Sequence, residues 1–267
     1  MGLGSFVMQV RNKTILVTGA TGGIGALLCR QLAARGARLV LNCTSPEKLS
    51  MLRAELGAEH IAMPADVSTP VGRQSIVRVC SDAGGIDGLV NLAGILDFNM
   101  FQNQESALIA RILGVNTVAP VLLTRELLPM LIGRNEARIL NVGSIFGSIG
   151  HPGFTVYCAS KAAIKTFSEA LSRELADTGV SVAYIAPRAT STALNGDRVT
   201  ALNLALGNKT DTPALVAVSI ADMFEGNSRR RFLGWPEKLF VHINALLPAV
   251  VHKALVKNLP IIKKHAL

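Results

Sequence analysis

Hydrophobic residues along the chain alternate between short aliphatic runs and longer stretches with helical spacing. The short runs predict strands at 14–18, 38–42, 60–63, 88–92, 138–142 and 181–185. The stretches between them predict helices at 24–35, 46–56, 72–83, 106–121, 122–132, 157–177 and 213–224. This alternation is typical of βαβ units. The fold class we expect is therefore α/β, with a single doubly wound parallel sheet.

The pattern divides the chain into two parts. No linker rich in proline or glycine interrupts residues 1–225, which we interpret as one domain. The composition changes near Gly226, and residues 226–267 are interpreted as a basic amphipathic helical extension. In doubly wound sheets, ligands bind beyond the carboxyl ends of the strands. We therefore expect functional residues in the loops that follow each strand.

Charge sets the extension apart. The chain has 27 basic and 18 acidic residues, and residues 226–267 hold eight of the basic residues but a single acidic one, Glu237. Residues 237–258 are expected to be helical, with a break at Pro248. At helical spacing, one polar arc collects Lys238, His242, His252, Lys253 and Lys257.

Three roles are open for this extension. In the first, residues 229–267 lie on an anionic membrane surface, as basic amphipathic segments do. In the second they cover a pocket, and in the third they pack in a dimer interface. Nucleic acid is not expected as a partner, because the basic residues lack interleaved aromatic side chains on which bases stack. The longest uncharged stretch of the extension, 239–252, is shorter than the ~20 residues of a membrane span.

Cysteine usage indicates a reducing compartment. The cysteines at positions 29, 43, 80 and 158 form no CxxC pair, so neither a metal site nor a redox motif is expected. No secretory signal is apparent at the start of the chain. We therefore expect a cytoplasmic protein, with peripheral membrane contact through the extension as the open alternative.

A glycine-rich turn follows the first predicted strand. Residues 18–25 read TGATGGIG, with Gly19, Gly23 and Gly25 between strand and helix. Glycines here allow the backbone to approach a pyrophosphate, and the helix N-terminus supplies N–H donors and a positive dipole. The turn predicts a dinucleotide site, although glycines also occur in ordinary turns.

The end of the second predicted strand bears on which dinucleotide binds. NAD-selective sites usually place Asp or Glu ~20 residues beyond the glycines, on the ribose 2′-hydroxyl. No acidic residue occurs between Gly25 and Glu47, and the strand is followed by Thr44 and Ser45. Small hydroxyl groups tolerate a 2′-phosphate, so NADP(H) is favoured over NAD(H). NAD(H) stays the alternative, because no arginine lies in the glycine turn or at the strand end.

Four polar residues are candidates for acid–base chemistry. Tyr157 and Lys161 are four positions apart, on one face of a predicted helix. A tyrosine has a pKa of ~10 and is a poor base unless a cation stabilises its phenolate. Lys161 is placed to be that cation. Ser144 lies at the end of the strand before this helix, and Asn116 lies within the sequence GVNT.

Together with the sequence NLAG at 91–94, these motifs resemble the short-chain dehydrogenase/reductase family over residues 13–224. The resemblance implies a Rossmann fold and a homodimer formed through the helices around Asn116 and Tyr157. It implies that Tyr157 exchanges a proton with the substrate oxygen and that Ser144 hydrogen-bonds the same oxygen. Lys161 would lower the pKa of Tyr157 and bind the nicotinamide ribose, and Asn116 would hold a water that relays protons to Lys161.

The resemblance also assigns contacts to the cofactor and substrate. The cofactor residues it implies are Gly19, Thr21, Gly23, Ile24, Gly25, Thr44, Asp66, Val67, Asn91, Ala93, Gly94, Tyr157, Lys161, Pro187 and Thr192. The substrate pocket is expected to include Ile145, Phe146, Phe154 and Leu194. If these residues line the pocket, the substrate is apolar; ordinary core packing is the alternative.

Three features depart from the family pattern. Leu92 replaces the second asparagine of the usual NNAG, a change that the family tolerates. Arg188 replaces the glycine that commonly follows Pro187. Three roles are open for Arg188: it narrows the nicotinamide pocket, it brings a cation to the substrate side of the site, or its side chain is simply solvated. No C-terminal strand is evident, and the end of the chain resembles members that handle steroids or lipids.

The hypothesis that accounts for these features is an NADP(H)-dependent oxidoreductase. It would transfer a hydride to or from an apolar carbonyl or alcohol, such as a long-chain aldehyde, a 3-oxoacyl chain, a sterol or a polyketide-like ketone. The alternative is a non-catalytic dinucleotide-binding sensor or scaffold that docks through its basic extension. The intact set of four catalytic candidates favours the enzyme.

Overall fold

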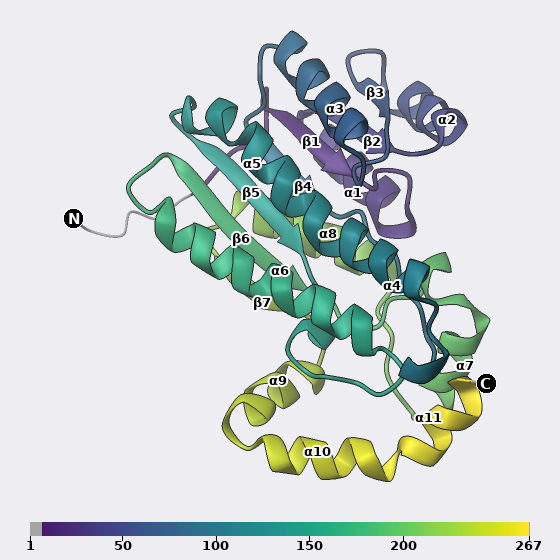
Figure 1. Ribbon diagram of the computed structural model, residues 1–267. Helices are drawn as coiled ribbons and strands as arrows, with labels where there is room; N and C mark the ends of the chain where they lie inside the picture. Colours follow the sequence, from purple (N-terminus) through teal and green to yellow (C-terminus); the bar gives the residue numbers. More distant parts are fainter. Residues whose placement is uncertain (1–6, 267) are drawn as a thin grey trace.

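A seven-stranded parallel sheet forms the centre of the molecule (Figure 1), in the strand order β3-β2-β1-β4-β5-β6-β7. The computed structural model describes residues 7–266, so the first residues, where no secretory signal is expected, lie outside the described part. The strands are β1 (Thr14–Thr18), β2 (Arg38–Cys43), β3 (Ile61–Pro64), β4 (Gly88–Asn91), β5 (Ala137–Val142), β6 (Val180–Ala186) and β7 (Arg230–Phe232). The predicted doubly wound α/β fold is confirmed.

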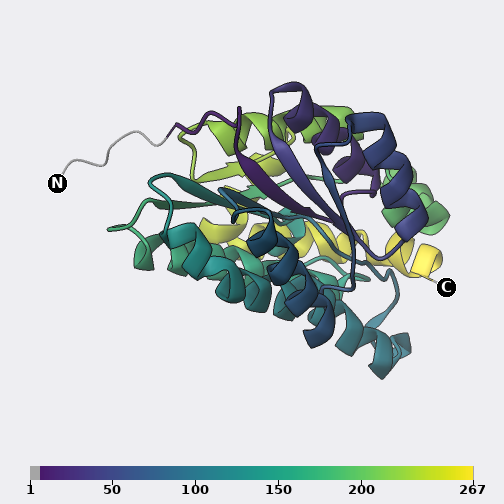
Figure 2. The same cartoon turned by 90° about the horizontal axis from the view of Figure 1, so that it is seen from above.

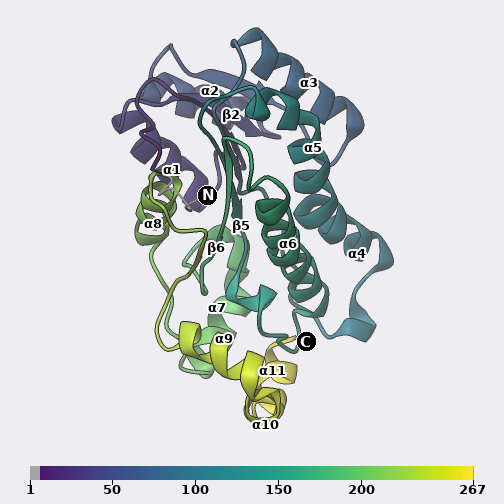
Figure 3. The same cartoon turned by 90° about the vertical axis from the view of Figure 1, so that its left-hand side faces the viewer.

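Helices cover both faces of this sheet (Figures 2 and 3). One face carries α1 (Gly23–Ala34), α2 (Pro46–Leu56) and α8 (Pro213–Glu225), and the other carries α3 (Pro70–Asp82), α4 (Ser106–Leu113), α5 (Ala119–Ile132) and α6 (Thr155–Glu174). The central strands are mostly apolar and buried, and every residue of β5 is buried, including Arg138 and Asn141. Near-continuous apolar strands are expected where both faces of a parallel sheet are covered.

The chain reverses its winding direction beside β1, which pairs with β2 on one side and β4 on the other. Ligands bind at such a switch point, outside the carboxyl ends of the strands. At this edge the structure also places α7 (Gly196–Ala205), α9 (Glu237–Leu246), α10 (Pro248–Lys257) and α11 (Leu259–Ala266), as Figures 1 and 3 show.

The expectation that no C-terminal strand is present is wrong. Arg230–Phe232 forms β7, which pairs in parallel with β6 at the edge of the sheet. The strand is three residues long and two of them are arginines, so no aliphatic run marks it in the sequence. The first residues of the expected extension are therefore part of the sheet, and the helical arm begins at α9.

Other elements differ in detail. The two helices expected over 106–132 form one helical run, in which a π-helical turn (η2, Gly114–Val118) joins α4 to α5. The leucine-rich segment after β6 folds into α7. As expected, the helix after Glu237 is broken at Pro248, which begins α10.

One helical run, Ser106–Ile132, is long and apolar enough to cross a membrane by length and composition alone, among the residues that the structure describes. Its residues Leu123, Leu127 and Leu131 are fully buried, in the core between the sheet and the helices of this face. The run is therefore part of the helical layer that covers this face of the sheet.

Candidate active site

The glycine-rich turn lies between β1 and α1, where the backbone is packed most tightly. A Cβ atom on Gly25 would lie 2.1 Å from the carbonyl oxygen of Gly19, and one on Gly19 would lie 2.9 Å from Cα of Ala93. Gly19 also has a φ of 69°, which glycine adopts at little cost. The turn therefore has no room for a side chain at Gly19 or Gly25.

This turn leaves donors for an anion. The N-cap of α1 is Gly22, which has no side chain to cap the helix, and the first turn of α1 contains no acidic residue. Helix N–H groups without partners attract phosphate. Thr192, from the loop after β6, packs against Gly23, where a Cβ would lie 3.0 Å from its Cγ2. The chemistry of this cradle fits the pyrophosphate of a dinucleotide.

A cavity of about 780 Å³ extends from this turn to the helices of the arm. Ligand sites commonly have volumes of ~300–1,000 Å³. The cavity is lined near the turn by Gly19, Gly23, Ile24, Gly25, Ala93 and Gly94, and then by Ser144, Tyr157, Lys161, Pro187 and Thr192. The structure thus brings most of the predicted cofactor residues and three of the catalytic candidates to one cavity.

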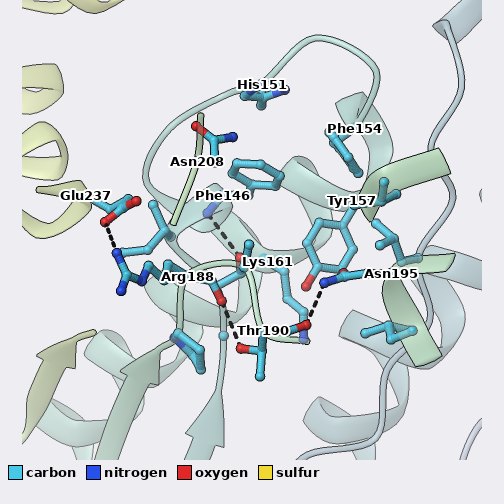
Figure 4. A pocket seen from close by; sticks show the side chains of 18 of the residues that line it. Phe146, His151, Phe154, Tyr157, Lys161, Arg188, Thr190, Asn195, Asn208 and Glu237 are labelled. Atoms are coloured by element: carbon cyan, nitrogen blue, oxygen red, sulfur yellow. Dashed lines mark hydrogen bonds and ion pairs between the residues drawn. The ribbon is translucent and has the colours of Figure 1, made fainter. Parts of the chain in front are cut away.

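Tyr157 and Ser144 both line this cavity, and Figure 4 shows the Tyr157 side chain there beside Phe146. Burial raises the pKa of Tyr157 to about 12, and a hydrogen bond with the Ser144 side chain partly opposes that shift. The Ser144 hydroxyl also accepts a hydrogen bond from the backbone N–H of Phe146, at 3.2 Å. Tyr157 is therefore a protonated phenol at neutral pH and can act as a proton donor.

Lys161 lies one helical turn beyond Tyr157 on α6. Its Nζ is 5.7 Å from the centroid of the Tyr157 ring and donates a hydrogen bond to the carbonyl of Val142, at 3.1 Å. Burial lowers the pKa of Lys161 to about 8, because the low-dielectric interior disfavours the ammonium form. The ammonium still predominates at pH 7 and is close enough to stabilise a developing phenolate.

Asn116 is held in the π-helical turn η2. Its Oδ1 accepts a hydrogen bond from the N–H of Ile95, and its Nδ2 donates to the carbonyl of Ile95 and to the Ser160 hydroxyl. Single π-helical turns occur frequently at functional sites. A Cβ on Gly94 would lie 3.3 Å from Asn116 Oδ1 and 3.5 Å from Lys161 Nζ, so this glycine keeps the space between the two side chains open.

Several expected cofactor residues lie away from the large cavity. Thr21, Thr44 and Asp66 do not line it, and Asp66 instead accepts hydrogen bonds from the N–H and hydroxyl of Ser68. The Asn91 side chain points into the interior, where its Nδ2 donates to Thr124 and Asn141. Val67 and Asn91 both border a small neighbouring void beside Asn116 and Lys161. Asn91, at the end of β4, therefore connects β4 to β5 and α5 through these hydrogen bonds.

The four residues expected in the substrate pocket, Ile145, Phe146, Phe154 and Leu194, all line the cavity. Sequence reasoning missed other lining residues, among them His151, Asn203, Asn208, Phe240, Ile243, Val250, Val251 and Leu255. His151 stacks on Phe146 at 4.9 Å, and burial lowers the pKa of His151, so its ring is neutral. The apolar face of 239–255 was the signal that could have revealed the contribution of α9 and α10.

Of the three roles that the sequence left open for Arg188, the solvated one is wrong: the side chain is largely buried and lines the cavity. Its guanidinium donates to Asp211 at 2.6 Å and to Glu237 at 3.0 Å, and its side chain is only 12% exposed. A Cβ on Gly234 would lie 2.4 Å from Cδ of Arg188, so the side chain passes directly against the start of the arm. Arg188 therefore ties the loop after β6 to α9.

Comparison with known proteins agrees with this geometry. The family profile described as short chain dehydrogenase matches residues 13–203, and the 3-oxoacyl-[acyl-carrier-protein] reductase FabG of Vibrio cholerae is 32% identical over 89% of this chain and 98% of its own. The chain belongs to the short-chain dehydrogenase family. It is accordingly an NAD(P)-dependent oxidoreductase. Nodulation protein G of Rhizobium sp. (strain N33) is 39% identical, over 68% of this chain and 74% of its own.

Two solved structures of short-chain dehydrogenases share the fold. The 3-ketoacyl-(acyl-carrier-protein) reductase of Brucella melitensis, complexed with NADH, superposes with a TM-score of 0.77, at 26% identity over 84% of this chain and 96% of its own. A Burkholderia cenocepacia short chain dehydrogenase in complex with NADP has a TM-score of 0.80, at 23% identity over 93% of this chain and 99% of its own. The second structure shows the shared fold, and the NADH-bound reductase supports a nicotinamide dinucleotide as the cofactor.

Proposed function

We propose that this short-chain dehydrogenase reduces the carbonyl group of an apolar, chain-like substrate such as a 3-oxoacyl thioester or a long-chain aldehyde. The observation that carries the proposal is the apolar lining of the cavity. Besides the glycine-rich turn and the pair Ser144 and Tyr157, the cavity is lined by Phe146, Phe154 and apolar side chains of α9 and α10. A substrate with its carbonyl at Tyr157 would therefore extend an apolar tail toward the arm.

The catalytic residues have complementary tasks in this reduction. A bound nicotinamide dinucleotide supplies the hydride for the carbonyl carbon. Tyr157 transfers its phenolic proton to the carbonyl oxygen, and the Ser144 hydroxyl hydrogen-bonds that oxygen as negative charge develops on it. The Lys161 ammonium stabilises the phenolate that remains. Asn116 holds the water through which Tyr157 regains a proton.

NADP(H) is the cofactor that we favour. The segment between Gly25 and Glu47 contains no carboxylate that would repel a 2′-phosphate, and the exposed Thr44 follows β2 directly. By the family resemblance, Asp66 and Val67 stay assigned to the adenine ring and Thr21 to the cofactor.

We also propose a homodimer formed through the helical run 106–132 and α6. The exposed apolar side chains of Leu113, Val118 and Ile132 on this run support it, because they would leave water in such an interface. A cytoplasmic enzyme is consistent with the four cysteines, all of which are free thiols. The alternative of a non-catalytic sensor has no support in the geometry, since the catalytic candidates lie close together.

The proposal is tested by NADPH and NADH consumption with a chain-length series of 3-oxoacyl thioesters and aldehydes. We expect rates that rise with chain length, a preference for NADPH, and a loss of ~10²–10⁴-fold in Tyr157→Phe. Tyr184→Phe is the matched control: Tyr184 donates to the backbone carbonyl of Ser144, at 3.2 Å, and its loss should cost far less. Full activity in Tyr157→Phe would overturn the mechanism, and rates independent of chain length would overturn the substrate class.

A further inference from the structure

The arm, residues 237–266 with helices α9, α10 and α11, lies across the carboxyl end of the sheet (Figures 1 and 3). Its inner side is anchored by buried apolar residues: Val241 in α9, Val251 in α10 and Ile262 in α11. Asn244 adds a hydrogen bond from its Nδ2 to the carbonyl of Ser148. The arm is thus a packed part of the fold, with a defined outer side.

Apolar side chains are concentrated at the turn between α9 and α10. Leu246 is 80% exposed and Leu247 is 60% exposed, and Val256 on α10 is 48% exposed. Neither leucine lines the cavity. Adjacent leucines left in water at the tip of a packed helical hairpin are unfavourable for an isolated protein, and such patches mark interaction sites.

Exposed lysines occur along the same arm. At 100° per residue, Lys253 and Lys257 lie on the side of α10 opposite the buried Val251, together with Val256. Further exposed lysines of the arm are Lys238, Lys263 and Lys264. The single acidic residue of 226–267, Glu237, is paired with Arg188 and turned away from this side. The outer side of the arm is therefore apolar and cationic, without an acidic residue to oppose an anionic surface.

We propose that this outer side docks on the surface of an anionic lipid membrane. Leu246 and Leu247 enter the boundary between headgroups and acyl chains, and Lys253 and Lys257 contact lipid phosphates, as basic amphipathic segments do at membrane interfaces. The lipid surface is the occupant that accounts for both features, because an acidic protein would match the lysines but leave the two leucines without a partner.

Docking in this orientation has a consequence for substrate access. Phe240 and Val250 line the cavity and are also 45% and 56% exposed, so the cavity opens along α9 and α10, next to the turn. An apolar substrate dissolved in the membrane then reaches the cavity without crossing water. This consequence rests on the proposed function, whereas docking itself does not.

Co-sedimentation of the full-length protein with phosphatidylcholine–phosphatidylserine vesicles (7:3) and with pure phosphatidylcholine vesicles tests the docking. We expect binding to the anionic vesicles, little binding to the neutral ones, and weakening at high salt. Lys253→Gln/Lys257→Gln should weaken binding by on the order of twentyfold, at about fivefold per lysine. Leu246→Ser/Leu247→Ser should weaken it at least about tenfold, since each buried leucine contributes strongly.

Matched controls carry the same chemical changes elsewhere on the surface. Met51→Ser/Val71→Ser removes two side chains that are each 74% exposed, and Lys48→Gln/Arg78→Gln removes two exposed charges from α2 and α3. Both controls should bind vesicles like the wild type. Melting temperatures and turnover of a short soluble substrate, both unchanged in the arm variants, would show that the fold and the catalytic site are intact.

The proposal is overturned if the wild type does not sediment with anionic vesicles at low salt. It is also overturned if the control pairs weaken binding as much as the arm pairs, because the effect would then be one of net charge or hydrophobicity. Loss of binding in the lysine pair with none in the leucine pair would overturn the insertion of Leu246 and Leu247 into the membrane, because charge alone would then account for the binding. Since sedimentation requires no turnover, a failure of the proposed reaction leaves this test unaffected.

Discussion

At the scale of single residues, the site depends on two ionisable groups whose burial shifts their pKa values in opposite directions. Burial raises the pKa of Tyr157 to about 12 and lowers that of Lys161 to about 8. The same low-dielectric environment therefore keeps the tyrosine protonated and makes the lysine costly to charge. In the proposed mechanism this cost has a use, because the Lys161 ammonium stabilises the phenolate that forms on Tyr157.

Replacing Lys161 by methionine should therefore stabilise the free protein while abolishing turnover. The lysine titrates near 10.5 when unfolded and near 8 when folded, so below pH 8 both states are charged and the full penalty is present. Between pH 8 and 10.5 the unfolded state binds more protons, and the wild type gains stability. Urea unfolding should show an advantage of the variant of up to roughly 3 kcal/mol at pH 7. The advantage should shrink toward pH 10.

The exposed Lys48, on α2, provides the control, because its replacement removes no buried charge. If Lys161→Met proves less stable than the wild type at pH 7, the lost hydrogen bond from Lys161 to Val142 outweighs the cost of burying the ammonium.

At the scale of elements, glycine has different roles in the turn before α1 and in the π-helical turn η2. Gly25 lies in a contact too close for any side chain, and its helix begins without a capping side chain. Gly114 has open space around it and lies within the continuous run of α4 and α5. The first position requires glycine on steric grounds, whereas the second does not.

Alanine at each position should separate these two cases. A Cβ on Gly25 would lie 2.1 Å from a backbone carbonyl oxygen, so Gly25→Ala should cost more than about 3 kcal/mol of unfolding free energy and weaken dinucleotide binding. Gly114→Ala should be neutral or stabilising by up to about 1 kcal/mol, because alanine loses less conformational entropy in a helix. Thermal melts with and without NADPH measure both. Equal effects at the two positions would contradict the steric argument.

At the scale of the whole molecule, Arg188 connects the sheet to the arm that closes the cavity. Asp211 and Glu237 come from segments far apart in the sequence. Arg188, in the loop after β6, forms ion pairs with both. Asp211 is buried, and its second carboxylate oxygen has no hydrogen-bond partner among the described residues. The Arg188 guanidinium therefore has to compensate the buried carboxylate of Asp211, and the same guanidinium holds Glu237 of the arm.

Arg188→Met should therefore destabilise the protein and loosen the arm. Removing one partner of a buried pair leaves an uncompensated charge and costs ~3–5 kcal/mol. Arg78→Met is the control, since Arg78 is 85% exposed and lies 4.0 Å from Asp82; surface pairs of this kind contribute ~0–1 kcal/mol. Urea unfolding and limited proteolysis within residues 237–266 measure the two effects. Unchanged protease resistance of the arm in Arg188→Met would show that Arg188 does not hold it.

The sequence by itself determined the α/β fold and the catalytic candidates. The apolar runs of strands such as Thr14–Thr18, the glycines of the first turn and the spacing of Tyr157 and Lys161 are local features, which a linear pattern records. Only the tertiary structure decided the rest. β7 forms because β6 offers an open edge, Arg188 is neutralised by carboxylates distant in sequence, and the arm lines the cavity through residues after Glu237. Each of these depends on contacts between distant segments, and such contacts leave no periodic signal along the chain.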